Sequence, residues 1–220
     1  VAALERTLLA AQNSESYVRI VVTRGAGPLG LDPALADSPR TIVIVRPLSL
    51  PAPQLYQEGA SLVVVDVRWN LRRAVDPAVK SGNYLTNVMA LAQARAKGAY
   101  EAAMCNVDGT LAEGSSSNLF CVRDGAVCTP PTGPGLLAGI TRRRVLELAR
   151  AAGCVVREAS LRPEELRAAA EVFLTSSIRG ILPITSVDGA VVGDGKVGVV
   201  TRALMDLYEL FLRGVAAGKV

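Results

Sequence analysis

The chain has 220 residues, of which 50% are hydrophobic and 20% are charged, an ordinary composition for a folded globular protein. Its 24 basic residues exceed its 20 acidic ones but are scattered, aromatic residues make up only 4%, and no apolar run approaches the roughly 18 residues of a membrane span, so neither nucleic acid nor a membrane is an expected partner. Histidine is absent, which excludes Ser-His-Asp and Cys-His catalysis and the common zinc sites; no metal site is expected, and acid-base chemistry falls to a group such as lysine.

The first third of the chain is expected to hold one helix and three strands. Leu4, Leu8 and Leu9 recur at helical spacing and predict a helix over 1–12. Three β-branched runs, separated by turns rich in Gly and Pro, predict strands at 17–23, 41–45 and 61–67.

Beyond residue 77, helices and strands alternate irregularly. Helices are predicted at 84–97, 141–152, 163–169 and 199–213, and strands at 101–106, 119–129, 154–159 and 171–174. Hairpin turns are predicted at Asp124-Gly125 and Asp188-Gly189. Because hairpins are frequent, we expect a mixed or antiparallel sheet and an α+β (mixed α/β) fold.

The four cysteines indicate a reducing cytoplasm, since no Cys-x-x-Cys pair and no signal-peptide pattern is found. A two-residue turn at Asp124-Gly125 would place Cys121 opposite Cys128. They could form a redox pair, although two small buried hydrophobic side chains are the more ordinary interpretation.

Two residues suggest chemistry by their positions. Lys80 lies where an extended segment turns through 81–83 into a predicted helix, a junction from which its amine can point into a cleft. A solvated surface lysine is the ordinary alternative. Glu113 ends a strand before the small residues 114–117, where its carboxylate could face water or the pyridine nitrogen of a cofactor.

Two further segments could hold a phosphate group. Gly139, Ile140 and Thr141 open a predicted helix, where unpaired N–H groups and the helix dipole favour an anion. Thr141 could equally be a plain helix cap. The run 175–177 offers a second set of hydroxyls and amides. Together with Lys80 and Glu113, these segments are typical of a pyridoxal-phosphate enzyme, in which a lysine holds the cofactor as a Schiff base.

In their order and content the motifs resemble those of the class IV aminotransferases, the fold-type IV pyridoxal-phosphate enzymes. This family includes branched-chain aminotransferases, D-amino-acid aminotransferases and aminodeoxychorismate lyases. The resemblance runs from about Arg19 to the C-terminus and is carried by four blocks: Lys80-Ser81-Gly82-Asn83-Tyr84, Glu113-Gly114-x-x-x-Asn118-Leu119-Phe120, Leu137-x-Gly139-Ile140-Thr141-Arg142, and Glu171-Val172-Phe173 with Thr175-Ser176-Ser177 and Pro183-Ile184.

The resemblance implies that pyridoxal 5′-phosphate is bound covalently by Lys80, the catalytic residue, which also moves a proton between the substrate Cα and the cofactor C4′. It implies that Glu113 pairs with the ring nitrogen, that Tyr84 reaches the phenolic oxygen and that Leu137 packs against the ring. The implied phosphate-binding residues are Gly139, Ile140, Thr141, Ser176 and Ser177. The substrate carboxylate is expected near the Ser177 and Ile178 amides, to which the Arg179 side chain could add a contact.

The subfamily is not fixed by these motifs. The block 82–84 is more similar to the branched-chain type, whereas 113–118 is also familiar from the D-amino-acid type. Arg179 stands where branched-chain enzymes tend to carry a small residue, so the substrate stays open.

The implied architecture is a fold-type IV enzyme of two domains, the N-terminal one incomplete because family members carry a phosphate-clamping arginine upstream of Val1. We expect 1–67 to be the remainder of the small N-terminal domain, 68–77 the interdomain linker and 78–220 the larger cofactor-binding domain. The implied function is that of a cytoplasmic, homodimeric aminotransferase acting on an amino acid, possibly branched-chain in type, and a 2-oxo acid. Two alternatives remain: an aminodeoxychorismate lyase on the same fold, or a truncated chain that does not retain cofactor.

Overall fold

The computed structural model describes residues 1–68, 79–133 and 136–218. Spatial contacts divide the chain into two compact units, Val1–Leu50 and Pro51–Val220, and each is described by itself. The linker expected at 68–77 lies, apart from Arg68, outside the described residues. None of the helices in the described parts combines the length and apolar character that crossing a bilayer requires.

The first unit is a helix and an antiparallel two-stranded ribbon. Helix α1 spans Ala2–Ala11, strands β1 and β2 span Ser16–Thr23 and Arg40–Pro47, and a short 3-10 helix, η1, spans Pro33–Leu35. The strands pair in an unbroken register from Ser16 opposite Pro47 to Thr23 opposite Arg40. The long connection between them is held by Arg24, whose guanidinium donates to the carbonyls of Pro33 and Ala36 at 2.7 and 3.1 Å.

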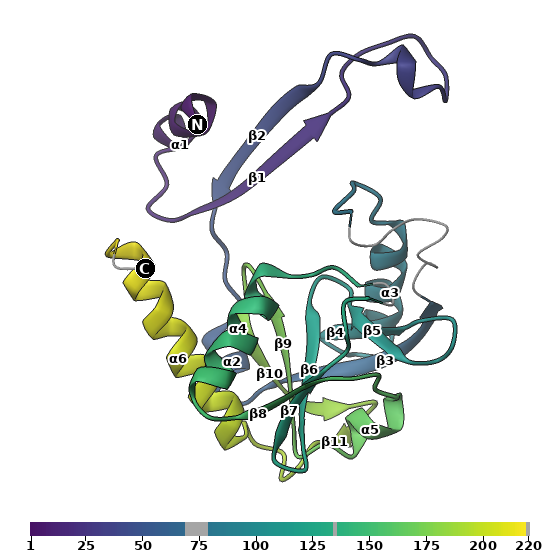
Figure 1. Ribbon diagram of the computed structural model, residues 1–220, viewed down its shortest axis with the longest axis vertical. Coiled ribbons are helices and arrows are strands. Elements are labelled where there is room, and N and C mark those ends of the chain that lie inside the picture. The colour runs from purple at the N-terminus through teal and green to yellow at the C-terminus, as the bar shows by residue number, and fades with distance from the viewer. Residues whose placement is uncertain (69–78, 134–135, 219–220) are drawn as a thin grey trace. The chain divides into compact units, whose positions relative to one another are not determined.

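The second unit, in its described residues, is built on a nine-stranded sheet with the order β5-β4-β3-β10-β9-β6-β7-β8, and β11 pairs with β10 (Figure 1). The β3–β4, β3–β10 and β7–β8 pairs are parallel and the others are antiparallel, so the predicted mixed sheet is confirmed. The strands are β3 Ala60–Arg68, β4 Glu101–Cys105, β5 Leu111–Gly114, β6 Asn118–Arg123, β7 Ala126–Thr129, β8 Val155–Glu158, β9 Glu171–Ser176, β10 Gly180–Val187 and β11 Ala190–Val191.

Five helices in the described part of this unit accompany the sheet: α2 Pro53–Gln57, α3 Leu85–Ala96, α4 Ile140–Ala151, α5 Pro163–Arg167 and α6 Val199–Ala216. Helix α3 packs on β3 and β4, whereas α4 and α6 pack on β9 and on each other (Figure 1). Because successive strand residues face opposite sides, Phe120 and Phe173 stack at 4.8 Å in the cluster under α4 and α6, while Leu119 and Leu174 enter the core on the other face.

Most predicted elements are confirmed with boundaries shifted by one to three residues, as expected where helix and strand ends fray. Asp124 and Gly125 both have positive φ, and their turn places Cys121 directly opposite Cys128. Both thiols are free, and both side chains are buried in the hydrophobic core. They pack there as small hydrophobic side chains do. The strand expected to end at Glu113 is β5, and the hairpin expected at Asp188-Gly189 joins β10 to β11. Helix α2 was not predicted from the sequence, because its five residues are too few for a periodic pattern.

Strand β3 lies inside the large sheet, between β4 and β10. The division between the two compact units therefore falls at Leu50 and Pro51, earlier than the domain boundary expected at 67. The assignment of 1–67, 68–77 and 78–220 to the small domain, linker and large domain of the family fold stays a prediction, because the division rests on spatial contact alone.

Candidate active site

A cavity of about 220 Å³ lies within the second unit, where four separate segments meet. These segments are 79–87 at the start of α3, 113–118 between β5 and β6, 137–141 at the start of α4, and 175–177 at the end of β9. Nine residues predicted to bind a cofactor line it: Lys80, Tyr84, Glu113, Leu137, Gly139, Ile140, Thr141, Ser176 and Ser177. Ile178 and Arg179 are not among the lining residues.

Glu113 is the buried acid of this cavity, and the residue is 7% exposed. Its carboxylate accepts from the Leu137 amide at 3.1 Å and from Nδ2 of Asn118 at 3.3 Å. Burial raises the pKa of Glu113 to about 8, although the Leu137 hydrogen bond and the charge of Lys80 both act to lower it. A further cation placed beside this carboxyl group would therefore convert it to the carboxylate at neutral pH.

A tight turn places Glu113 at the cavity. The Gly114 amide donates to the carbonyl of Ser117 at 2.7 Å, and a Cβ at Gly114 would overlap the Ser117 hydroxyl, so a larger residue there would displace that side chain. From helix α3, Nδ2 of Asn87 donates to the Ser115 carbonyl at 2.8 Å. The small residues 115–117 that follow Glu113 in the sequence thus place their backbone beside the cavity.

Lys80 and Tyr84 line the cavity just before α3 begins at Leu85. The Ser81 amide donates to the Val79 carbonyl at 2.7 Å and bends the chain at Lys80. Nζ of Lys80 lies 6.0 Å from the centroid of the Tyr84 ring. Lys80 and Glu113 both line the cavity, and the charge of Lys80 acts to lower the pKa of Glu113.

The amino end of α4 opens onto the cavity. Gly139 is the capping residue, in an extended conformation, and no side chain of the described residues caps the helix. Thr141 is buried in the first turn, so the interpretation of Thr141 as a plain N-cap is wrong. A Cβ at Gly139 would overlap the side-chain oxygen of Asn118, which explains the need for glycine. The first turn of α4 therefore keeps N–H groups available for an anion.

The end of β9 supplies three hydroxyls. Thr175 is 1% exposed, and its Oγ1 is buried without a hydrogen-bond partner among the described residues. Ser176 accepts from both the amide and Nε of Arg179, at 3.3 and 3.1 Å. Ser177 is exposed beside it. A buried hydroxyl that lines a cavity and lacks a partner gains a hydrogen bond when a polar ligand fills the cavity.

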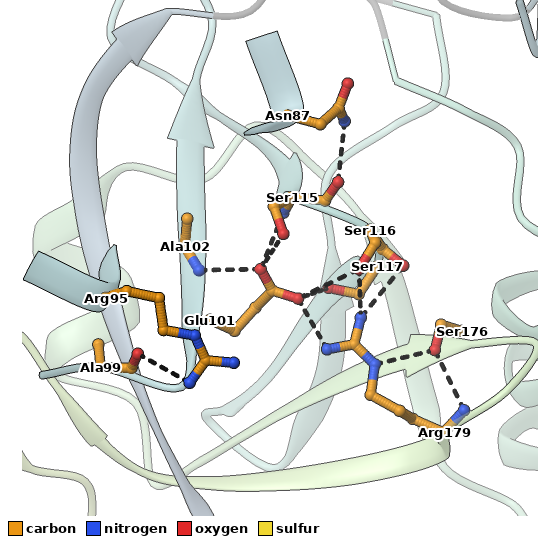
Figure 2. Close-up of polar contacts among 10 residues, drawn as sticks. All are labelled: Asn87, Arg95, Ala99, Glu101, Ala102, Ser115, Ser116, Ser117, Ser176 and Arg179. Carbon is orange, nitrogen blue, oxygen red and sulfur yellow. Dashed lines mark hydrogen bonds and ion pairs between the residues drawn. The ribbon is translucent and has the colours of Figure 1, made fainter. Parts of the chain in front are cut away.

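Arg179, which is not among the lining residues, pairs with Glu101, at the start of β4, with 2.7 Å between Nη1 and Oε2 (Figure 2). Glu101 was not identified from the sequence. The signal was present, since Glu101 is the single charged residue of a strand whose other four residues are apolar, and a buried charge requires a partner. The direct contact between Arg179 and substrate expected from the sequence stays a prediction.

Comparison with known proteins gives one consistent family. The family model for amino-transferase class IV matches residues 2–187. A protein of Methanocaldococcus jannaschii, provisionally named a branched-chain-amino-acid aminotransferase, is 37% identical over 195 residues, covering 89% of this chain and 67% of that protein. The D-alanine aminotransferase of Bacillus licheniformis is 31% identical over 191 residues, covering 87% of this chain and 65% of that protein.

The crystal structure of a branched-chain amino acid aminotransferase from T.th., solved with pyridoxamine 5′-phosphate, matches this fold with a TM-score of 0.90 at 27% identity, over 99% of this chain and 70% of that one. The fold and the cavity thus define a class IV aminotransferase architecture, which confirms the mixed α/β, fold-type IV prediction. The chain belongs to the amino-transferase class IV family. It spans about two thirds of the length of these relatives.

Proposed function

We propose that the protein binds pyridoxal 5′-phosphate in this cavity and transfers an amino group between an amino acid and a 2-oxo acid. The observation that carries the proposal is the convergence of Lys80, Glu113 and Thr141, from three separate segments, on one cavity. A reactive amine, a buried acid and a helix amino end are the groups that such a cofactor requires.

The residues of the cavity fit this cofactor on their own chemistry. The carboxyl group of Glu113 is buried without a full countercharge, as its raised pKa indicates, and a protonated ring nitrogen would supply that charge. The unpartnered hydroxyl of Thr175 marks a polar space that the described residues do not fill. At the other end, the uncapped first turn of α4 suits a phosphate dianion.

The bound cofactor would supply an electron sink for the substrate Cα. Lys80 would hold it covalently through Nζ and would move the proton between Cα and C4′. Glu113 would hold the ring nitrogen in its protonated form, since Asn118 and Leu137 keep its carboxylate in one orientation. Tyr84 would donate to the phenolic oxygen, and the half-buried Leu137 would pack against the ring face.

Two segments would bind the phosphate. The first turn of α4 would contribute its N–H groups and the hydroxyl of Thr141, with Gly139 allowing the close approach. The hydroxyls of Ser176 and Ser177 would approach from the end of β9. For the substrate carboxylate we propose the turn that contains Ile178. Arg179 borders the same turn, but its guanidinium donates to Glu101, Ser116 and Ser176.

Branched-chain amino acids are the first donors to test. The apolar residue Val79 also lines the cavity and suits an uncharged substrate side chain. Because a branched-chain enzyme and a D-alanine aminotransferase both stand among the similar proteins, the donor panel includes both stereoisomers.

We also propose a cytoplasmic homodimer. Support for a reducing compartment comes from the four cysteines, which are all free. Support for self-association comes from Leu85, Val88 and Met89, which share one side of α3 and are 66%, 61% and 50% exposed. Sedimentation equilibrium of the purified protein would give a monomer mass if this part of the proposal is wrong.

The test of the proposed activity is a spectroscopic titration followed by an amino-acid panel. Addition of pyridoxal phosphate to the purified chain should produce the visible absorbance of a lysine-bound cofactor, and a donor should deplete it until a 2-oxo acid restores it. A preparation that stays colourless contradicts the proposal and favours a chain that does not retain cofactor. Steady release of pyruvate from aminodeoxychorismate, with no 2-oxo acid acceptor, would instead identify a lyase.

A further inference from the structure

Glu101 is a buried carboxylate outside the cavity, and its side chain is 1% exposed. Its Oε1 accepts from the amides of Ala102 and Ser115 at 2.9 and 3.2 Å, and also from the Ser115 hydroxyl. Its Oε2 accepts from Nη1 of Arg179 at 2.7 Å (Figure 2). Separating such a buried pair would leave an uncompensated charge in the protein interior, which is strongly destabilising. The folded chain therefore keeps the two side chains together.

Every nitrogen of the Arg179 guanidinium has an acceptor. Nη1 donates to Glu101, Nη2 donates to the carbonyl and hydroxyl of Ser116 at 3.2 and 2.8 Å, and Nε donates to Oγ of Ser176 at 3.1 Å. The Arg179 side chain is only 12% exposed. The planar guanidinium therefore joins the turn after β5 to the last residue of β9, both of which line the cavity (Figure 2).

The contacts with Ser176 have a chemical consequence. A serine hydroxyl has one proton to donate and two lone pairs that accept. The amide and Nε of Arg179 occupy both lone pairs of Ser176 Oγ. The hydroxyl proton of Ser176 is then left to donate, and Ser176 lines the cavity. With both lone pairs engaged by Arg179, the Ser176 hydroxyl can act towards a further polar group only as a donor.

We infer that the Glu101–Arg179 pair is a positioning device that orients the Ser176 hydroxyl toward the cofactor phosphate, and that Arg179 does not receive the substrate carboxylate. The inference rests on the proposed binding of pyridoxal phosphate. Arg179 acts through Ser176 and Ser116, and Glu101 acts by holding Arg179. Because the acceptor is the phosphate, the pair should affect pyridoxal phosphate and leave pyridoxal, which lacks the phosphate, almost unaffected.

The experiment measures the dissociation constants of both ligands for the cofactor-free full chain, from the change in visible absorbance. Arg179→Met and Glu101→Gln should each weaken pyridoxal phosphate binding about tenfold, which equals about 1.4 kcal/mol, and should change pyridoxal binding less than about twofold. The double variant should bind pyridoxal phosphate no more weakly than the worse single variant, because both substitutions disrupt the same ion pair. Arg123→Met, which removes the Arg123–Glu165 ion pair outside the cavity, is the matched control and should bind as the wild type does.

Three results would contradict the inference while leaving the proposed function uncontradicted. One is an unchanged affinity for pyridoxal phosphate in both single variants. Another is an equal loss for pyridoxal and pyridoxal phosphate, which would place the effect away from the phosphate. The third is an Arg179→Met protein that binds pyridoxal phosphate normally but needs a much higher amino-acid concentration for half-saturation, which would make Arg179 a substrate receptor.

Amide hydrogen exchange of the cofactor-free protein supplies a readout that needs no ligand. Arg179→Met should speed exchange in 115–117 and 176–177 about tenfold relative to Arg123→Met, because it frees both segments. If Arg179→Met does not fold, Arg179→Lys replaces it in both measurements, with the same selective loss expected, since one ammonium group cannot span Glu101, Ser116 and Ser176. A wild-type chain that binds neither ligand would refute the proposed function, and unchanged exchange would refute the joining of the two segments.

Discussion

Asn118 holds Glu113 at the cavity: its Nδ2 donates to the Glu113 carboxylate at 3.3 Å and to the Leu137 carbonyl at 2.9 Å. The Leu137 amide donates to the same carboxylate at 3.1 Å, which closes a small network between β5, β6 and the segment before α4. The orientation of the buried acid therefore depends on the first residue of β6 and on the segment that leads into α4.

The covalent attachment point can be identified directly. Lys80 lines the cavity and lies close enough to Glu113 to lower its pKa, so borohydride reduction of the loaded protein should label Lys80. Peptide mapping by mass spectrometry locates the label. Lys97 and Lys196 lie outside the lining of this cavity, and a label on either would refute the assignment.

Glu113→Gln should reduce turnover far more than it reduces cofactor binding. A neutral amide cannot hold the ring nitrogen protonated as charge develops, and loss of such electrostatic stabilisation costs about 10²-fold or more in kcat. The dissociation constant for pyridoxal phosphate should rise less than about tenfold, because the phosphate contacts remain. Glu165→Gln, which removes a carboxylate outside the cavity, should alter neither quantity. Equal losses in binding and turnover for Glu113→Gln would indicate a structural role.

The cofactor-free protein should lose stability as the pH rises from about 4.5 to about 8. Between these values folded Glu113, with its pKa raised to about 8, keeps a proton that the unfolded chain has released, so the free energy of unfolding falls with increasing pH. The stabilising contribution is complete below pH 4.5 and is lost as the pH passes through 8. Glu113→Gln removes this titration, so the melting temperature of the wild type should fall relative to the variant between about pH 5 and about pH 8. Parallel melting curves would show that Glu113 is not protonated in the empty cavity.

Gly139→Ala should damage the site through Asn118. The added Cβ would overlap the side-chain oxygen of Asn118, and the displaced amide would lose its contacts with Glu113 and Leu137. Overpacking of this kind costs about 1–3 kcal/mol, and in a chain of this size each kcal/mol lowers the melting temperature by about 2–4 °C. Gly133→Ala is the control, because a Cβ at Gly133 meets no atom of the described residues within 4 Å. Calorimetry that shows equal melting temperatures for the two variants would contradict the close contact at Gly139.

The local features of this protein follow from residues that are neighbours in the chain. Helical spacing and turn chemistry located most helices and strands, and the Asp124-Gly125 turn set Cys121 opposite Cys128, because side-chain direction and turn geometry depend on neighbouring residues. The motifs around Lys80 and Glu113 similarly indicated the family, since their residue types and order are visible without coordinates.

Which distant groups meet depends instead on how the whole chain folds. The fold places β3 inside the large sheet, leaves the Thr175 hydroxyl without a partner among the described residues, and pairs Arg179 with Glu101 across 78 positions of sequence. No local pattern encodes these relationships, because they depend on strand order and on the long-range register of β4, β9 and β10. From the sequence Arg179 was expected near the substrate carboxylate, which stays a prediction. Its pairing with buried Glu101 could not be read from the sequence, because only the folded chain brings these two residues together.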